Sequence, residues 1–304
     1  MKVVFVINNK GGRLNKVLPK ITQHCEGTIQ GEVSFFSTEY IRHATQLARE
    51  ATDQGCNVLI AVGGDGTLNE VVNGILTSAV PAENYPVLGL LPHGSANDFA
   101  RTAGIDQSVE ALVDRINQNS HRRIDLGKIE LPQKKEIRYF INISGVGLGP
   151  EVVQRLEGTN SVLGPGFNYF KHILKGFLGY RKKEVNCKTD HWEWQGPLLQ
   201  MAVANGRYYG NGICTAPDAL LDDGQFQVAI FGNLSVWDYL KNLGKLKNGL
   251  KIDHPEVHYF TGQEVHLSCK TPCGIEADGE FVGNLPARLA ILPDAIDFLS
   301  PSPR

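Results

Sequence analysis

The residues with the clearest chemical potential form one glycine-rich segment, Gly63-Gly64-Asp65-Gly66-Thr67-Leu68-Asn69-Glu70. It follows an apolar run and opens a stretch of helical spacing, so its backbone N–H groups can surround phosphate oxygens at the start of a helix. Asp65 is unexpected there, because phosphate repels a carboxylate unless a cation lies between them or the acid serves catalysis. The segment therefore predicts a site for a magnesium–nucleotide complex. A glycine-rich turn capped by Asp65 and Thr67 is the purely structural alternative.

A second polar segment, His93-Gly94-Ser95-Ala96-Asn97-Asp98-Phe99-Ala100-Arg101, follows the next apolar run. Ser95 can donate its hydroxyl to a nucleotide, Asn97 can bridge two stretches of backbone, and Asp98 can add a second carboxylate that faces Asp65. Alternatively, Asn97 or Asp98 only caps a helix. Together the two polar segments predict the walls of a cleft.

Two common types of phosphate-binding machinery are absent from the sequence. The chain has no GxxxxGK[ST] segment, which excludes a P-loop. It also lacks the HRD and DFG elements of protein kinases. We therefore expect phosphate binding of another type.

The elements that would position these segments alternate between strand and helix over residues 1–125. Thr38 can cap one of the helices and Gly55 can end it. The pattern predicts a doubly wound α/β domain, which binds ligands at the carboxyl ends of its strands. The expected strands are Lys2–Ile7, Val33–Thr38, Asn57–Val62 and Pro86–Leu91, and the expected helices are Ile41–Ala51 and Thr67–Leu76.

Residues 126–304 have a different sequence pattern, in which strand-like stretches are separated by turn residues. This pattern predicts a second, mainly antiparallel β domain. Helical spacing interrupts it at Asn168–Leu178 and Val236–Leu246. The expected strands are Tyr139–Ile143, Leu199–Ala204, Phe226–Phe231, Val257–Phe260, Val265–Cys269 and Ala287–Leu292.

Composition excludes several classes of protein. With 304 residues and a formal net charge of -2, the chain lacks the basic surplus typical of nucleic-acid binders. The apolar run near the N-terminus is too short for a signal peptide, and no later run approaches a membrane span. We therefore expect a cytoplasmic protein. The six cysteines form no CxxC pair, so we expect reduced thiols, although Cys269 and Cys273 could share a strand face.

Four segments occur in a fixed order along the chain: GGDGTLNEVVNG from Gly63, GSANDFAR from Gly94, Gly210-Asn211-Gly212 with the following 216–224, and Ala277-Asp278-Gly279-Glu280. In this order they resemble the diacylglycerol kinase catalytic family. Within that family the chain is most similar to the bacterial soluble lipid kinases, which in turn resemble sphingosine kinases. The resemblance spans almost the whole chain. It is specific for the family and weak for the substrate.

The resemblance implies that ATP binds at the GGDGT segment, at an amino-terminal loop whose family form is NPxSG, and at a threonine after the second strand. This chain has Asn9 where proline is usual, Gly11 where alanine or a small hydroxyl residue is usual, and Ser95 where threonine is usual. The implied nucleotide-binding residues are Asn8, Asn9, Lys10, Gly11, Gly12, Thr38, Gly63, Gly64, Asp65, Gly66, Thr67, Leu68, Asn69 and Ser95.

The resemblance also implies a magnesium loop, in which the Asp223 carboxylate and the main-chain carbonyls of Leu220 and Gln225 hold Mg²⁺. Oxygen ligands from a tight turn suit this ion. Without the resemblance, the Asp222-Asp223-Gly224 segment indicates only a polar hairpin turn.

By the same resemblance, Glu280 is the general base that accepts the proton of a lipid hydroxyl. We expect Asp65 and Asp98 to be further catalytic residues, near the Mg²⁺-phosphate. From local sequence alone, Glu280 is equally a solvated residue of an Asp-Gly turn. Asp125 matches another family aspartate near the domain junction and is expected to support the site.

For the acceptor, the family default is diacylglycerol or a related glycerolipid, reached at a membrane surface. An apolar helical stripe over Phe167–Leu178 is followed by Arg181-Lys182-Lys183, which could rest on an anionic bilayer. A core-facing helix with a solvated basic end is the alternative. The sequence also leaves a homodimer open.

Two other functions remain open. A kinase of the NAD kinase type also uses a GGDGT loop, although Asn69-Glu70 and the GSANDFAR segment favour the lipid branch. A catalytically silent nucleotide- or lipid-binding protein could keep the fold. The presence of Asp65, Asp223 and Glu280 argues against that alternative.

Overall fold

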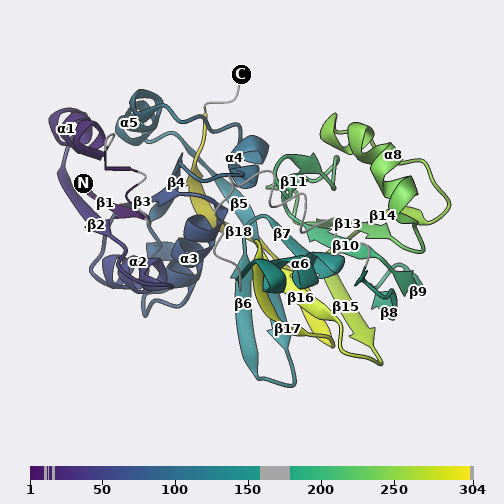
Figure 1. Ribbon diagram of the computed structural model, residues 1–304. Helices are drawn as coiled ribbons and strands as arrows, with labels where there is room; N and C mark the ends of the chain where they lie inside the picture. Colours follow the sequence, from purple (N-terminus) through teal and green to yellow (C-terminus); the bar gives the residue numbers. More distant parts are fainter. Residues whose placement is uncertain (10–11, 13, 16–17, 158–178, 302–304) are drawn as a thin grey trace. The chain divides into compact units, whose positions relative to one another are not determined.

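The computed structural model describes residues 1–9, 12, 14–15, 18–157 and 179–301. The chain divides into two units (Figure 1). One comprises Met1–Leu126 together with Pro293–Arg304, and the other comprises Gly127–Leu292. This division differs from the predicted domain ranges at the C-terminus, where the last part of the chain returns to the first unit.

The first unit has a parallel sheet in the order β2-β1-β3-β4, and Phe298 of β18 pairs in parallel with Leu88 of β4. Figure 1 shows α1 and α5 on one face of this sheet and α2 and α3 on the other. The predicted doubly wound α/β class is confirmed. The elements are β1 Lys2–Ile7, α1 Leu18–Thr28, β2 Glu32–Ser37, α2 His43–Asp53, β3 Val58–Gly63, α3 Asp65–Leu76, the 3-10 turn Ala82–Asn84, β4 Val87–Pro92, α4 Asp98–Ala103 and α5 Val109–Asn117.

Alternation along β1 explains why it takes this central place. Val3, Phe5 and Ile7 are buried in one cluster with residues of α1 and α5, among them Ile21 and Ile116. Side chains of a strand alternate between faces, so the intervening valines point to the α2 and α3 face, where they are equally buried. A strand that is apolar on both faces is stable only between two helical layers.

The start of α2 differs from the sequence prediction. Thr38 does not cap this helix, because α2 begins at His43 and its N-cap residue, Arg42, makes no side-chain cap. Instead, a Glu70 carboxylate oxygen on α3 accepts the Ala44 N–H at 3.1 Å. The capping group therefore comes from the neighbouring helix rather than from the preceding loop.

The second unit is a β-sandwich. One sheet contains β18-β15-β8-β9 with β5 and β6, and the other has the order β14-β13-β10-β7-β16-β17. The elements are β5 His121–Leu131, β6 Glu136–Phe140, β7 Ile143–Gly147, α6 Leu148–Glu157, β8 Lys183–Lys188, β9 Glu193–Leu198, β10 Gln200–Ala204, β11 Tyr208–Tyr209, β12 Ile213–Cys214, β13 Phe226–Phe231, α8 Val236–Lys247, β14 Val257–Gly262, β15 Glu264–Cys269, β16 Gly274–Ala277, β17 Glu280–Asn284 and β18 Ala287–Leu299.

Two apolar clusters hold this unit together. One lies between the sheets and contains alternate residues of both, such as Met201, Val228 and Leu267. The other lies on the outer face of the second sheet, where α6 and α8 cover it with residues such as Val152 and Leu246. The predicted antiparallel β character is confirmed, with two helices added as a third layer.

Two elements predicted for residues 126–304 are not found as strand or helix among the described residues. The predicted strand Tyr139–Ile143 is wrong, because the chain bends at 141–142 between β6 and β7, which lie in different sheets. The predicted helix Asn168–Leu178 lies outside the described residues. Among the described residues, no helix is long and apolar enough to cross a membrane. All six cysteines are free thiols.

Candidate nucleotide site and catalytic hairpin

Three neighbouring strands of the first unit end at the same edge of the sheet. The Asn8 N–H, just after β1, donates to the Val62 carbonyl of β3 at 2.9 Å. The His93 N–H, just after β4, donates to the Gly63 carbonyl at 2.7 Å. The loops after β1, β3 and β4 therefore begin side by side, at the carboxyl edge where doubly wound sheets bind ligands.

The loop after β3 turns directly into α3. Gly64 is the N-cap residue of this helix, and the first helical N–H with a backbone partner is that of Leu68, which donates to the Gly64 carbonyl at 3.1 Å. The amides of Asp65, Gly66 and Thr67 precede it, where a helix supplies no carbonyl acceptors. Together with the helix dipole, these amides could bind an anion.

A side chain of the first loop holds this helix end in place. Asn8 Nδ2 donates to Thr67 Oγ1 at 2.9 Å. Thr67 in turn lies close over Gly63, where an added Cβ would stand only 2.5 Å from the Thr67 hydroxyl. Glycine at position 63 is therefore a steric requirement for the bond between the end of β1 and the start of α3.

The loops after β3 and β4 pack backbone against backbone. A Cβ added at Gly94 would lie 2.3 Å from the Gly64 Cα, so neither position has room for a side chain. The Asn97 side chain closes the second loop on itself, since its Oδ1 accepts the Gly94 N–H at 2.9 Å and its Nδ2 donates to the Gly94 carbonyl at 3.1 Å. The sequence prediction that Asn97 joins two separate stretches of backbone is thus replaced by a bond within one turn.

Asp65 connects the two loops through its carboxylate. Oδ2 accepts the Asp98 N–H at 3.1 Å and Oδ1 accepts the Phe99 N–H at 3.0 Å. Asp65 therefore caps α4, and the amide dipoles there offset part of its charge. This offset lowers the repulsion that an anion at the start of α3 would meet. Asp98 is 5% exposed and contributes its backbone N–H to this cap.

The other residues predicted to bind nucleotide take different positions. The Leu68 and Asn69 side chains are fully buried, and Asn69 Oδ1 accepts a hydrogen bond from Asn73. These two side chains face the protein interior, so only their backbone could serve a ligand. Ser95 is exposed in the loop after β4. Thr38 directly follows β2, and its N–H donates to the carbonyl of Ile7, the last residue of β1.

The amino-terminal loop is described only in part. Asn9 Oδ1 accepts the Leu14 N–H at 2.8 Å, and the Gly12 N–H donates to the Asn9 carbonyl at 2.9 Å. Gly12 has a φ of 71°, which suits glycine. Lys10 and Gly11 lie outside the described residues. Asn9 thus serves as an organiser of this loop.

Glu280 lies in the second unit, at the start of β17 directly after a tight hairpin turn. The two central residues of the turn, Asp278 and Gly279, have φ values of 48° and 86°, as two-residue hairpins require. One Glu280 oxygen is 2.9 Å from the Arg138 guanidinium, and the Glu280 side chain is 30% exposed. The Asp-Gly turn expected from the sequence is present, and it fixes where Glu280 stands.

Asp278 anchors this hairpin, a role that the sequence did not assign to it. Its carboxylate accepts the N–H groups of Ile141, Asn142 and Ile143 at 2.9 to 3.0 Å. Ile141 and Asn142 connect β6 to β7, and Ile143 is the first residue of β7. A carboxylate that accepts three amides is a strong attachment, because each bond is charge-assisted. In the sequence, the only sign of this role was an acidic residue directly before the glycine of the predicted hairpin turn.

Glu276 on β16 was also missed. Its side chain is fully buried and one oxygen accepts the Gly279 N–H at 2.5 Å. Burial raises the pKa of Glu276 to about 8, and the nearby Asp278 carboxylate adds to this rise. An added Cβ at Gly145, its partner on β7, would stand 2.3 Å from the other Glu276 oxygen. The Glu276 side chain therefore occupies the space that a side chain at position 145 would need.

The predicted magnesium loop is a polar turn before β13. Asp223 is exposed, and its Oδ1 accepts the Gln225 N–H at 3.0 Å. Leu220 is also exposed, at 55%. Among the described residues, no group of three or more His, Cys, Asp or Glu side chains could hold a metal ion. A cation at this turn would thus depend on main-chain oxygens beside one carboxylate.

Comparison with known proteins assigns the two parts of the chain. Residues 2–129 match the model of the diacylglycerol kinase catalytic domain, and residues 143–300 match that of the YegS C-terminal NAD kinase beta sandwich-like domain. A diacylglycerol kinase of Staphylococcus saprophyticus is 32% identical over 277 residues, which cover 89% of this chain and 86% of the relative. One from Staphylococcus aureus is 33% identical over the same length, with 83% of that relative covered.

The fold agrees with this assignment. The crystal structure of a putative diacylglycerol kinase from Bacillus anthracis has a TM-score of 0.76 at 20% identity, over 99% of this chain and 97% of that chain. A second diacylglycerol kinase structure from the same organism has a TM-score of 0.70 at 18% identity, with the same coverage. Because these family models match most of the chain and relatives are more than 30% identical over most of their length, the chain belongs to the diacylglycerol kinase family.

Proposed function

We propose that this protein is a lipid kinase that transfers the γ-phosphate of ATP to the hydroxyl of diacylglycerol or a related glycerolipid. The observation that carries the proposal is the start of α3, where three amides without helical acceptors stand beside a carboxylate that already caps α4. Family membership supports a kinase. Since ATP is a cytoplasmic nucleotide and the acceptor is a lipid, we place the reaction at the cytoplasmic surface of a membrane.

In this proposal the amides of Asp65, Gly66 and Thr67 bind the phosphate oxygens of ATP. Asn8 keeps these amides in place through Thr67, and Asp65 keeps the loop after β4 in place through its bonds to the start of α4. Each bond links two elements, so the phosphate site is organised before a ligand arrives. Such preorganisation is the main contribution that a protein makes to phosphoryl transfer.

A divalent ion fits the donor chemistry of the turn before β13. The Asp223 carboxylate keeps one oxygen outside its bond to the Gln225 N–H, and main-chain carbonyls from Leu220 and Gln225 complete an oxygen-only set that suits Mg²⁺. When bound, the ion would supply positive charge that fixes this acidic turn. We propose these three residues as its ligands.

Glu280 is proposed as the general base. It takes the proton of the lipid hydroxyl while that oxygen bonds to the γ-phosphorus, the bond from phosphorus to the bridging oxygen breaks, and ADP leaves with the electron pair. Arg138 holds the Glu280 carboxylate at 2.9 Å, and the Asp278 anchor fixes the hairpin that carries it. A Glu280→Gln change is expected to lower turnover by on the order of a hundredfold or more while ATP binding is retained. Turnover that is unchanged would exclude Glu280 as the base.

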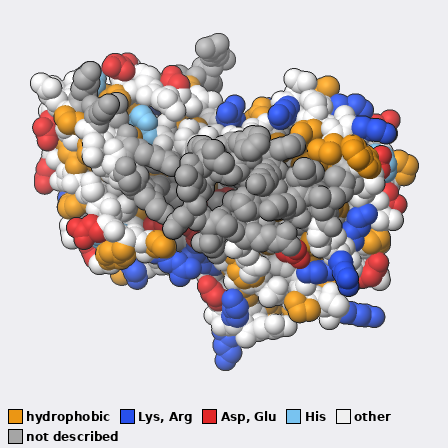
Figure 2. Space-filling view, viewed as in Figure 1, with side chains coloured by type: hydrophobic (Ala, Val, Ile, Leu, Met, Phe, Trp, Pro, Cys, Tyr) orange, Lys and Arg blue, Asp and Glu red, His pale blue; other side chains and the backbone are white. Residues whose placement is uncertain are grey.

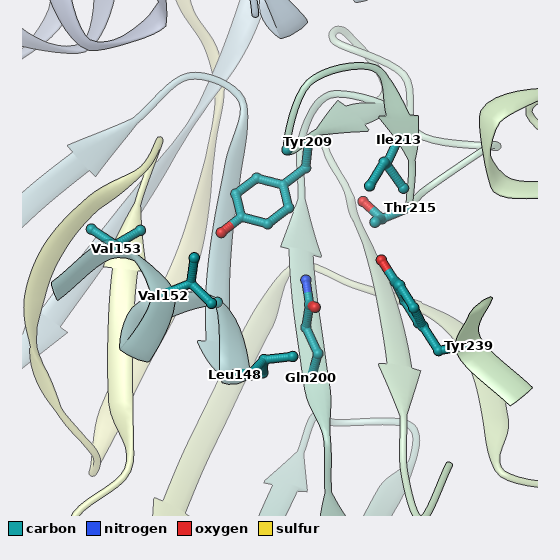
Figure 3. A pocket seen from close by; sticks show the side chains of 10 residues that line it. Leu148, Val152, Val153, Gln200, Tyr209, Ile213, Thr215 and Tyr239 are labelled. Carbon is teal, nitrogen blue, oxygen red and sulfur yellow. The ribbon is translucent and has the colours of Figure 1, made fainter. Parts of the chain in front are cut away.

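The acceptor part of the proposal is supported by an apolar pocket in the second unit (Figure 3). It lies against α6, β10, the β11–β12 hairpin and α8. Leu148, Val152 and Ile213 contribute apolar lining. The polar side chains that line it are Gln200, Tyr209, Thr215 and Tyr239. A few polar groups in an apolar pocket suit part of an amphipathic molecule such as a glycerolipid.

The experiment that tests this function offers several acceptors at once. Purified protein is incubated with Mg²⁺, γ-labelled ATP and a mixed lipid extract, with NAD in a parallel reaction, and labelled products are identified by mass spectrometry. We expect a phosphorylated glycerolipid whose label is lost in Glu280→Gln. Phosphate transfer to NAD but to no lipid would overturn the proposal.

An NAD kinase-type activity is the second candidate, because the model that matches residues 143–300 is named for an NAD kinase-like sandwich. The parallel reaction with NAD decides between the two. If neither acceptor is labelled and Asp65→Ala leaves nucleotide binding unchanged, a catalytically silent protein of this fold becomes the better interpretation.

A further inference from the structure

Helix α8 of the second unit has two unlike faces. Its inner face is part of the core, with Leu246 fully buried and Tyr239 7% exposed. Its outer face presents Trp237, which is 73% exposed, followed at four-residue intervals by Lys241 and Lys245. Residues at this interval lie on one side of a helix. A large aromatic side chain therefore stands in line with two cations on the surface.

The basic character of this surface continues beyond the helix. Lys247 lies in the last turn, and Leu250, 56% exposed, folds back on that turn through the bond of its N–H to the Lys245 carbonyl at 3.0 Å. On the other side, Lys182 Nζ donates to Asn233 Oδ1 at 2.8 Å, just before the helix begins. We call Lys182, Trp237, Lys241, Lys245, Lys247 and Leu250 the α8 surface.

The α8 surface is basic, although the chain as a whole is slightly acidic. Residues 236–251 contain four lysines and one aspartate, whereas the whole chain has a formal net charge of -2. The aspartate, Asp238, is engaged in the N-terminal capping box of α8, where it accepts the Ser235 N–H at 3.3 Å. The hydrogen bond from the Ser235 hydroxyl lowers the pKa of Asp238. Lys251 is paired with Asp218, so the positive charge is concentrated on the lysines of the helix itself.

We propose that the α8 surface docks the protein on an anionic lipid bilayer, with Trp237 at the depth of the headgroups and the lysines against their phosphates. Trp prefers this depth because its ring is apolar and its N–H is polar. Each lysine close to an anionic surface strengthens binding by about fivefold. Figure 2 shows hydrophobic and basic side chains next to one another over the region where Figure 1 draws α8.

A second observation points to a lipid as the occupant. Tyr239, on the inner face of α8, lines the apolar pocket of Figure 3. The same helix thus borders the proposed acceptor pocket on one side and carries the basic surface on the other. The inference rests on the proposed function, because only a lipid acceptor requires contact with a bilayer.

Vesicle sedimentation tests the surface directly. We compare equimolar phosphatidylglycerol–phosphatidylcholine vesicles with phosphatidylcholine vesicles for wild type and for Lys241→Gln/Lys245→Gln. The wild type should bind the anionic vesicles, and the double variant should bind them on the order of 30-fold more weakly. High salt should weaken wild-type binding as well. The matched control is Lys188→Gln/Lys270→Gln, which removes the same charge from exposed positions elsewhere and should bind as wild type does.

Fluorescence gives an independent measurement. Anionic vesicles should shift the tryptophan emission of the wild type to the blue, and Trp237→Phe should remove this shift while Trp192 and Trp194 remain. Equal vesicle binding by wild type and by the lysine double variant would overturn the proposal, as would equal binding of the wild type to both kinds of vesicle.

A water-soluble short-chain diacylglycerol separates this proposal from the proposed function. The lysine double variant should phosphorylate it as fast as wild type does, because a monomeric substrate needs no docking. Wild type that phosphorylates this substrate but binds no vesicle would overturn docking and leave the lipid kinase intact. Wild type that binds anionic vesicles but phosphorylates no lipid would instead contradict the lipid kinase.

Discussion

At the scale of single residues, two carboxyl groups show how the surroundings decide what an acid does. Asp65 is partly exposed and accepts two amide hydrogen bonds at the start of α4. Glu276 is fully buried, and its pKa is raised to about 8. Both acids lie next to residues proposed for catalysis. Their contribution to the free energy of unfolding must therefore be measured by denaturation rather than by enzyme activity.

Asp65→Ala should destabilise the first unit by about 1–3 kcal/mol, since two charge-assisted bonds to α4 are lost and their amides remain. Urea unfolding measures this loss. Glu83→Gln, at an exposed position of the 3-10 turn, is the control and should leave stability within about 0.5 kcal/mol of wild type. Unchanged stability in Asp65→Ala would mean that the cap of α4 contributes nothing to folding.

Glu276 makes stability depend on pH in a defined direction. The folded state holds the Glu276 proton up to a pH of about 8, whereas the unfolded chain releases it near the ordinary glutamate pKa of 4.5. The contribution of the protonated Glu276 side chain to the free energy of unfolding is therefore complete below pH 4.5, and it is lost as the pH rises towards 8. At about 1.4 kcal/mol per pKa unit, this loss amounts to a few kcal/mol.

Glu276→Gln should thus unfold at higher denaturant concentration than wild type at pH 8 and at nearly the same concentration at pH 4, measured by denaturation over this range. Glu264→Gln is the opposite case, because the Arg288 hydrogen bonds lower the pKa of Glu264 to about 2. The loss of stability in that variant should be present at neutral pH and shrink as the pH falls towards 2. A pH-independent difference between wild type and Glu276→Gln would contradict the assignment.

At the scale of elements, the candidate nucleotide site depends on how closely two loops approach. The loops after β3 and β4 meet at Gly64 and Gly94, where a Cβ would approach the opposite backbone to 2.3 or 2.9 Å. Backbone cannot move aside as a flexible side chain can. The spacing of α3 and α4 is therefore set by the absence of side chains at these two positions.

Gly94→Ala should consequently weaken ATP binding and destabilise the first unit by about 1–3 kcal/mol, the usual range for overpacking. Calorimetric titration with ATP and thermal unfolding measure the two effects. Gly27→Ala in α1 is the matched control: nothing lies within 4 Å of its added Cβ, and the change should stabilise by up to about 1 kcal/mol. If Gly94→Ala binds ATP as wild type does, the close approach is not required for the site.

At the scale of the whole molecule, strands β5 and β18 each contribute residues to both units. The last part of β18 returns to the first unit, where Phe298 pairs with Leu88 and the Ser300 N–H donates to the Ser120 carbonyl at 3.2 Å. Phe298 is 1% exposed and meets Phe99 edge to face, with 5.3 Å between the ring centroids. The end of the chain is thus part of the unit that carries the candidate nucleotide site.

Phe298→Ala should therefore destabilise the first unit by about 3–5 kcal/mol, because a buried aromatic ring leaves a cavity. Limited proteolysis should cut residues 1–126 of this variant faster than those of wild type. Phe36→Ala, at a position that is 45% exposed, should have a much smaller effect. Equal protection of wild type and Phe298→Ala would mean that the first unit does not depend on the C-terminal strand.

The sequence by itself determined the fold class of each part and the glycine-rich turn between β3 and α3, whose binding of phosphate stays a prediction. The run Val3–Ile7 is apolar at every position, which suits a strand between two helical layers. Glycines between a strand and a helix indicate a tight turn there. The Asp-Gly turn before Glu280 could also be predicted from the sequence, because an Asp-Gly pair between two strands is typical of a hairpin turn.

Tertiary structure decided what the sequence could not. The sequence predicted that Thr38 caps α2, but a Glu70 oxygen on α3 accepts the N–H at its start. The Asp65 carboxylate caps α4 and not its own helix, α3. The chain bends between β6 and β7 because these two strands belong to different sheets. The buried state of Glu276 and the return of β18 to the first unit have the same origin. Each depends on contacts between residues far apart in the chain, whereas periodicity and turn chemistry report only on neighbours.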